Sequence, residues 1–203
     1  VTVANTEFNN NSLFGWCIYV DGPANSSTLS DVHVTNCTFN NNLQKGIYVE
    51  KLEDAVFDGI TILNSGTDPT YGFNNGIDIN LKYRAYQNIQ ILNSTITGSG
   101  ATGSATNPYN PAAVTIKARD DAPSYNSAPA TLNNVVIDGC TIEGPQNALR
   151  FGEFDKVNAS PTAVVIKNST LTGSGADKYH LVNNTSADIL ATEGNTFTGS
   201  TTL

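Results

Sequence analysis

Residues 89–96 read Ile-Gln-Ile-Leu-Asn-Ser-Thr-Ile, and this stretch carries a pattern that recurs along the whole chain. Six further copies begin at Val1, Val32, Ala55, Val135, Val164 and Leu190. Successive copies start 31, 23, 34, 46, 29 and 26 residues apart. Apolar and polar residues alternate in each half of a copy, as they do in half-buried strands. A repeated unit of this length predicts a solenoid whose rungs are constant and whose loops vary.

The fifth and tenth positions of the pattern are restricted to two residue types. Asn and Gly adopt a left-handed backbone at the lowest cost, so we expect each coil to turn at both positions. Asn side chains stacked along the axis can also hydrogen-bond one another. The fifth position holds Asn5, Asn36, Gly59, Asn93, Gly139, Asn168 and Gly194, and the tenth holds Asn10, Asn41, Asn64, Gly98, Gly144, Gly173 and Gly199.

The other positions predict which side chains face the core. The eighth position is always Phe, Ile or Leu and the seventh is Thr in six copies, so the eighth should point inward and the seventh outward. A second set of strands is expected between the copies, with its second and fourth residues facing inward. These strands are residues 17–21, 46–50, 76–80, 113–117, 148–152 and, less clearly, 178–182. The sequence thus predicts one all-β domain over residues 1–203, a parallel β-helix of about seven coils with Asn and Gly turn ladders.

The rungs at residues 46–49 (Gly-Ile-Tyr-Val) and 75–79 (Asn-Gly-Ile-Asp-Ile), together with the ladders and Thr rows, resemble the pectate-lyase-like right-handed parallel β-helix superfamily. The resemblance covers nearly the whole chain and implies a right-handed solenoid. It implies no single activity, because that superfamily includes lyases, hydrolases, epimerases, tailspikes and adhesins. The capping helix usual in the superfamily is absent from the pattern, which starts at Val1. We therefore expect a module of a larger protein or assembly. One alternative function is a structural fibre, sheath or adhesin subunit that homo-assembles end to end through uncapped ends.

Charge and composition narrow the classes of partner. The formal net charge is −8, which disfavours nucleic acid and anionic membranes, and no apolar run is long enough for membrane insertion. Eight Asn-X-Ser/Thr triplets suit an extracellular or cell-surface protein, although those at Asn36, Asn93 and Asn168 belong to the structural repeat.

The cysteines are expected to be unpaired. Cys37 and Cys140 occupy the sixth position of copies that lie three coils, roughly 14 Å, apart, which is too far for a disulfide. They are therefore predicted to be buried thiols, whereas Cys17 falls on the second strand set.

The outward residues of the second strand set supply the candidate site. In coil order they include Tyr19, Tyr48 with Glu50, Asp78 with Asn80, Lys117 and Arg150. Spaced by about 5 Å per coil, aromatic and hydrogen-bonding groups of this kind suit a polysaccharide lying along the axis. The insertions at 98–111 and 119–130 are expected to form walls that bring in Tyr109 and Arg119. Tyr19, Tyr48, Asn80, Arg119 and Tyr109 are thus predicted to bind the substrate.

Two enzymatic alternatives stay open. A lyase or epimerase acting on uronic-acid polymers would use Lys117 or Arg150 as base, with Ca²⁺ held by Asp78, Asn80 and Glu50 to neutralise the substrate carboxylate. Asp78 is then also part of the catalytic set. A hydrolase would use two carboxylates, for which Asp21 and Glu50 in adjacent coils are candidates.

Overall fold

The computed structural model describes residues 1–23, 27–174 and 179–202, and these form an all-β parallel β-helix. Sheet A consists of β1 (Thr2–Ala4), β3 (Val32–Thr35), β5 (Ala55–Asp58), β8 (Ala85–Leu92), β11 (Thr131–Asp138), β15 (Thr162–Lys167) and β18 (Ile189–Ala191). Sheet B consists of β6 (Thr61–Leu63), β9 (Thr95–Thr97), β12 (Thr141–Gly144), β16 (Thr170–Gly173) and β19 (Thr196–Thr198). Sheet C consists of β2 (Phe14–Ile18), β4 (Lys45–Val49), β7 (Asn75–Leu81), β10 (Ala112–Arg119), β13 (Asn147–Phe151), β17 (Tyr179–Asn183) and β20 (Ser200–Thr202). The described ranges contain no helix that could cross a membrane.

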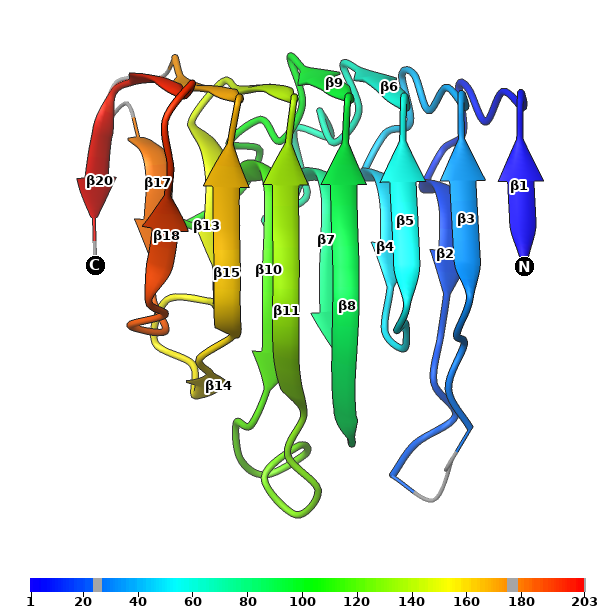
Figure 1. Ribbon diagram of the computed structural model, residues 1–203, viewed down its shortest axis with the longest axis vertical. Coiled ribbons are helices and arrows are strands. Elements are labelled where there is room, and N and C mark those ends of the chain that lie inside the picture. The colour runs from blue at the N-terminus through cyan, green and yellow to red at the C-terminus, as the bar shows by residue number, and fades with distance from the viewer. Residues whose placement is uncertain (24–26, 175–178, 203) are drawn as a thin grey trace.

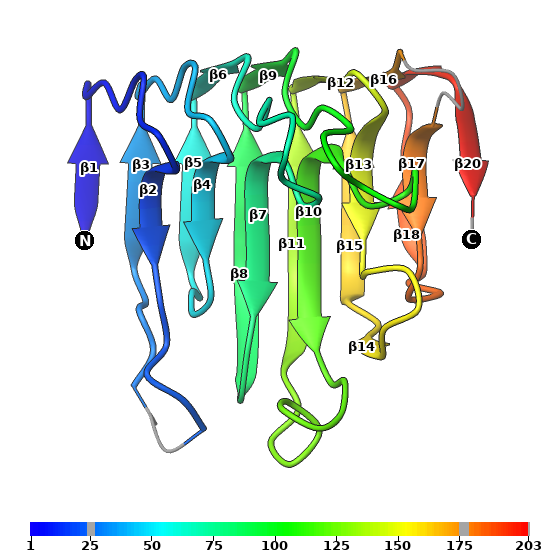
Figure 2. The ribbon, with the colours of Figure 1, turned by 180° about the vertical axis from the view of Figure 1, so that it is seen from behind.

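The chain winds as a right-handed solenoid. In Figure 1 the strands of sheet A run upward in front, the chain crosses the top through sheet B, and sheet C runs downward behind, while successive coils advance from right to left. Figure 2 shows sheet C from its outer side. Within the described residues, neighbouring strands along all three sheets are parallel, and only the short β14 (Asn158–Ala159) pairs antiparallel, with β10. The predicted seven coils and their parallel stacking are confirmed.

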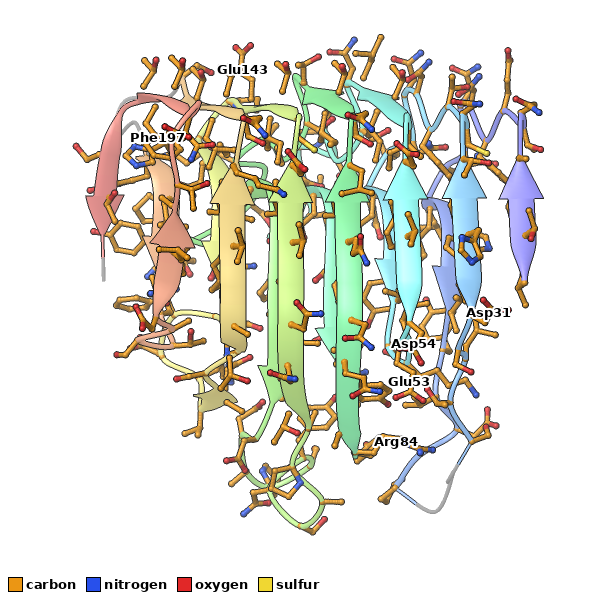
Figure 3. The ribbon with its side chains drawn as sticks, viewed as in Figure 1. Asp31, Glu53, Asp54, Arg84, Glu143 and Phe197 are labelled. Atoms are coloured by element: carbon orange, nitrogen blue, oxygen red, sulfur yellow. The ribbon has the colours of Figure 1, made fainter. Side chains whose placement is uncertain are left out.

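The interior is filled by the predicted inward rows. The first, third and eighth positions of the central copies are buried, and so are Ile47, Ile77, Val114 and Leu149 of the second strand set. Each coil buries its apolar face only against its neighbours, which is why the rungs repeat one residue class so strictly. In the five copies that begin at Ala55 and beyond, the seventh and eighth positions fall on sheet B. Glu143, at the ninth position of its copy, stands on the outer side of this sheet in Figure 3.

The left-handed corners are confirmed at every fifth position and only partly at the tenth. All seven fifth-position residues have positive φ, from 46° at Asn93 to 84° at Gly194. At the tenth position Gly144 and Gly173 instead end strands β12 and β16. The Asn ladder is mixed: Asn41 donates to Asn10 at 3.3 Å, but Asn93 donates to the carboxylate of Asp58 at 2.9 Å.

A further left-handed column, unforeseen in the sequence, precedes the first position of five copies. It comprises Asp31, Asp54, Asn88, Asn134 and Ala163, all with φ between 48° and 60°. Figure 3 shows Asp31 and Asp54 at the starts of β3 and β5. Asn88 donates to Asp54 at 2.6 Å and Asn134 donates to Asn88 at 2.9 Å. The ladder of hydrogen bonds stops at Ala163, which has no side-chain amide to continue it. Alanine also adopts a left-handed backbone conformation at a higher steric cost than Asn.

Replacing Ala163 with Asn is therefore expected to stabilise the protein by about 1 kcal/mol, because Asn tolerates positive φ better and its amide can reach Asn134. The urea unfolding midpoint measures this. Ala163→Gly should also stabilise, whereas Ala85→Gly, in an exposed strand position without positive φ, should destabilise. Equal effects of glycine at both sites would show that the left-handed strain at residue 163 is negligible.

The predicted register is wrong at both ends of the solenoid. In sheet C, Ile47 pairs with Trp16 where the predicted strands would pair it with Ile18, so β2 is displaced by two residues. Leu149 pairs with Leu181 where Tyr179 was expected, so β17 is also displaced by two residues. Lys178, the predicted start of that strand, lies outside the described residues. In sheet A, Val164 pairs with Ile189, which turns Leu190 outward and leaves it 59% exposed. An extra residue between Ala191 and Gly194 restores the alignment at sheet B.

The cysteine predictions are confirmed. All three are free thiols, with Cys37 and Cys140 buried and Cys17 exposed. Cys140 donates to the carbonyl oxygens of Ile91 and Asp138 at 3.3 and 3.4 Å, and burial raises its pKa to about 11. The two buried cysteines thus behave as small core residues.

Candidate functional site

A pocket of about 320 Å³ lies on the outer side of sheet C, over four successive coils. β4, β7 and β10 form its floor, and the segments before β7 and after β13 form its walls. Figure 2 shows these two segments as loops beside the strands of sheet C. Its lining residues are Lys45, Tyr48, Tyr71, Phe73, Asp78, Asn80, Lys117, Arg119, Glu153 and Lys156. Five of the predicted site residues therefore meet in one cavity: Tyr48, Asp78, Asn80, Lys117 and Arg119.

Except for Tyr19, the outward row is buried, although it lies on the outer face of sheet C. Asp78 is 1% exposed and Lys117 is 4% exposed, because the flanking segments fold over the sheet. These charges cannot be a solvated surface. Buried charges in proteins need partners, so their arrangement decides what the pocket can hold.

Asp78 is the centre of the buried charge cluster. Its Oδ2 accepts a hydrogen bond from Lys45 at 2.5 Å, and its Oδ1 lies 3.3 Å from Lys117 Nζ. Burial alone would raise the pKa of Asp78, but the charges of Lys117, Lys45 and Arg150 outweigh burial and hold that pKa well below its usual range. Asp78 is thus a permanent anion, and its Oδ1 accepts no hydrogen bond from the described residues.

Lys45 is a site residue that the sequence analysis missed. Its Nζ donates to Phe73 O at 2.9 Å, to Asn75 Oδ1 at 3.2 Å and to Asp78, which gives one acceptor to each ammonium proton. The nitrogen also lies 5.2 and 5.5 Å from the ring centres of Tyr48 and Tyr71. Burial lowers the pKa of Lys45 to about 8, even though Asp78 opposes the shift.

A second polar cluster adjoins the first. Tyr48 donates to Glu50 at 2.5 Å, and Asn80 donates to the Tyr48 hydroxyl at 2.9 Å. Glu50 also accepts from the Val20 amide at 3.0 Å and forms an ion pair with Lys82. Burial, the charge of Asp78 and the bond to Glu50 raise the pKa of Tyr48, so its hydroxyl stays protonated. Asn80 Oδ1 is enclosed yet has no donor within the described part of the chain.

Arg150 does not reach the pocket. It is completely buried, and its guanidinium donates to Gly152 O at 2.7 Å and to Thr115 Oγ1 at 3.3 Å. Burial lowers its pKa, but arginine stays charged near neutral pH. Arg150 pairs with Thr115 on the same outward row as Asp78, one coil beyond β10, and is a fixed, fully enclosed cation, which disfavours the predicted role as base.

The walls come from segments other than those expected. Asn74 fixes the segment before β7 by donating to Asp68 O at 2.7 Å and to Ala101 O at 3.1 Å, so the 98–111 insertion supports this wall from behind. Tyr109 packs against Phe154 and Tyr179 and does not line the pocket. Arg119 does line it, held by Asp121 at 2.5 and 2.8 Å and covered by the Tyr125 ring at 4.4 Å.

Tyr19 lies beside the pocket instead of in it. Its ring is 51% exposed and meets the Tyr48 ring edge-on at 5.4 Å. Because of the displaced register, Cys17 and not Tyr19 pairs with Tyr48. Tyr19 and Tyr48 are thus neighbours, as expected, but in different rows.

The Ca²⁺ hypothesis fits the contacts poorly. Asp78 faces two ammonium groups, and both oxygens of Glu50 already accept hydrogen bonds. Among the described residues, Asn80 Oδ1 and Asp78 Oδ1 of the proposed ligand set accept no hydrogen bond, and Asp78 Oδ1 lies 3.3 Å from the Lys117 ammonium. A divalent cation here would meet Lys45 and Lys117 at close range, and the described residues include no cluster of three His, Cys, Asp or Glu side chains suited to a metal.

The pocket is strongly cationic in an acidic protein. Four of the ten Lys and Arg residues line it, against two of the eighteen acidic ones, so the lining has a formal charge of +2 while the chain carries −8. Such a concentration of positive charge in a partly enclosed cavity favours an anionic ligand.

Comparisons with protein-family models, with curated proteins and with solved structures find no match to this chain.

Proposed function

We propose that the protein binds an anionic saccharide in the pocket on sheet C, at the cell surface or outside the cell. The observation that carries the proposal is the lining itself, in which Lys117, Arg119 and Lys156 surround a cavity walled by Tyr71 and Phe73. Cations bind carboxylates, and aromatic rings bind the apolar faces of sugars.

The hydrogen-bonding state of the cluster supports one position for the anionic group of the ligand. Lys45 has all three protons satisfied, so it fixes the wall and supplies charge. The nearest anionic atoms to Lys117 Nζ, Asp78 Oδ1 and Glu153 Oε2, lie at 3.3 and 3.6 Å, which leaves Lys117 able to donate to a ligand. We place the ligand carboxylate near Lys117, Arg119 and the exposed Lys156.

Hydroxyl groups of the sugar complete the floor. Asn80 Oδ1 and Asp78 Oδ1 are enclosed acceptors without donors in the described residues, and a buried acceptor costs about 1–3 kcal/mol when unsatisfied. A ligand that brings both a carboxylate and hydroxyl donors satisfies both kinds of group. A uronic acid unit has this composition.

An array of acidic and neutral glycans tests the proposal. We expect binding to uronic-acid oligomers that weakens as salt rises, because the attraction is electrostatic. The neutral glycans serve as the control. Binding confined to neutral glycans, or no binding across the array, would refute the proposal.

Affinity for the acidic glycan should fall as pH rises through about 8. A bound anion favours protonated Lys45, whose pKa is about 8 in the free protein, so binding takes up protons above that pH. We expect the dissociation constant to rise by about threefold to tenfold between pH 7 and pH 9 in calorimetric titrations. A flat profile would show that Lys45 is not coupled to the ligand.

A second candidate is a uronate lyase, favoured by the same lowered pKa of Lys45. Lys45, once deprotonated, would take the proton α to the carboxyl group of the uronic acid. A carbon–carbon double bond then forms as the glycosidic C–O bond breaks. Tyr71, whose pKa burial raises to about 12, would give its proton to the leaving oxygen. Unsaturated products absorb ultraviolet light. An absorbance increase with any uronic-acid polymer, lost in Lys45→Met while the polymer still binds, supports this candidate, and the absence of any increase refutes it.

A further inference from the structure

A second pocket lies next to the first, on the other side of the segment after β13. It has a volume of about 380 Å³, and Glu153 and Lys156 line both pockets. The second pocket adds Phe154, Asp155, Asn183 and Asn184. The floor of the first reaches β10 and that of the second lies at the end of β17, two coils further along the axis, or roughly 10 Å by strand spacing.

Hydrogen bonds within the protein hold the loop that lines the second pocket. Asn183 Oδ1 accepts from the amides of Thr185 and Ala187 at 3.3 and 3.2 Å, and its Nδ2 donates to Ala187 O at 2.9 Å. Asn183 is 5% exposed, so the loop after β17 is held by a buried side chain. Its neighbour Asn184 has an enclosed amide nitrogen that finds no acceptor in the described residues. This donor is available to a ligand oxygen.

The two pockets differ in charge. Lys45, Lys117, Arg119 and Lys156 outnumber the two acids of the first pocket, whereas Glu153 and Asp155 outnumber Lys156 in the second, for a formal charge of −1. Phe154, 38% exposed, offers an apolar ring there and is supported by Tyr109 at 5.6 Å between ring centres. A second carboxylate would be repelled from this pocket, and a neutral sugar would not.

We infer that the second pocket is a subsite for a neutral sugar unit, so that the protein binds a glycan in which acidic and neutral units alternate. This inference rests on the proposed function of the first pocket. The ligand crosses the Glu153–Lys156 segment, places its carboxylate beside Lys117, and hydrogen-bonds Asn184 with its neutral unit.

The test compares three probes by calorimetry: a methyl glucuronide, a tetrasaccharide of alternating glucuronic acid and N-acetylglucosamine, and a tetramer of uronic acid alone. We expect the alternating tetrasaccharide to bind at least tenfold tighter than the single unit and tighter than the homopolymer. Phe154→Ala and Asn184→Leu should each remove most of that gain and leave affinity for the glucuronide unchanged. Leu63→Ala, a similarly exposed apolar residue on sheet B, is the matched control and should change neither.

The outcomes separate this inference from the proposed function. If the glucuronide binds but the alternating tetrasaccharide binds no tighter than the homopolymer, or keeps its gain in both variants, the second subsite is refuted and the first stands. If no acidic probe binds, both are refuted. Phe154→Ala removes a partly exposed ring, so it tests the subsite even if Asn184→Leu fails to fold.

Discussion

Asp78→Asn is expected to destabilise the protein by about 3–5 kcal/mol, the usual cost of removing one partner from a buried ion pair. The carboxylate is 1% exposed and compensates Lys45, which is equally buried, together with Lys117 and Arg150. Asparagine keeps the shape of the side chain and removes its charge. The buried cations Lys45, Lys117 and Arg150 would then lose the carboxylate that compensates their charge.

Urea unfolding followed by circular dichroism measures this effect. Asp138→Asn is the matched control, because Asp138 pairs with Lys167 at 3.3 Å near the surface and should cost less than about 1 kcal/mol. Adding Lys45→Met to Asp78→Asn should restore part of the loss, since the unpaired buried ammonium is then gone. Similar costs for Asp78→Asn and Asp138→Asn would contradict the buried charge cluster.

The same carboxylate makes stability depend on acid. Its pKa is lowered on folding from an ordinary value near 3.8, so its contribution is complete above that pH and is lost as pH falls further toward the folded pKa. The wild type should therefore lose stability below about pH 4 more steeply than Asp78→Asn does.

Lys117→Met should lower affinity for the acidic glycan by about 10- to 100-fold, the range for a lost hydrogen bond to a charged group. Lys117 lines the pocket, and its ion pairs with Asp78 and Glu153 are long, at 3.3 and 3.6 Å, so its ammonium can still donate to the ligand. Methionine preserves most of the packing of the side-chain stem. Asp78 retains Lys45 and Arg150 as counter-charges, so the variant should still fold.

Lys167→Met is the control for this prediction. Lys167 lies on sheet A with its side chain 44% exposed, away from the pocket, and its loss lowers the net charge of the chain equally. We expect unchanged affinity for Lys167→Met. Equal loss in both variants would mean that binding reflects overall charge and not the pocket.

The fold was predictable because its determinants are local. The positive φ at Asn5, Gly59 and Asn168 follows from residue type alone, as do the buried rows. The first strand of sheet C shows the limit of sequence-based prediction. Inward and outward side chains alternate in both the observed strand, residues 14–18, and the predicted one, residues 17–21. Because side chains alternate every second residue, a register shift of two residues keeps the same side chains facing inward. Only contacts between coils decide between them. End-to-end assembly and the membership of a larger protein stay predictions.

The residues on the floor of the site were predictable from the sequence, but the segments that enclose it were not. Tyr48, Asp78 and Lys117 follow from strand alternation, whereas Tyr71, Phe73 and Lys156 come from segments outside the repeat. Lys45 was missed because the strand was expected to start at Gly46. The length of the segment between Asn64 and Asn75, with two aromatic residues near its end, was the available signal for a wall over the sheet.

The central claim is that the buried outward row of sheet C forms the floor of a pocket for an anionic sugar. Calorimetric titration with trigalacturonic acid and with its methyl ester, at pH 7 and low salt, tests this most directly, because the two ligands differ in charge at the carboxyl groups. We predict saturable binding of the acid, with the ester at least tenfold weaker. Equal affinity for acid and ester, or binding of the ester alone, would contradict it.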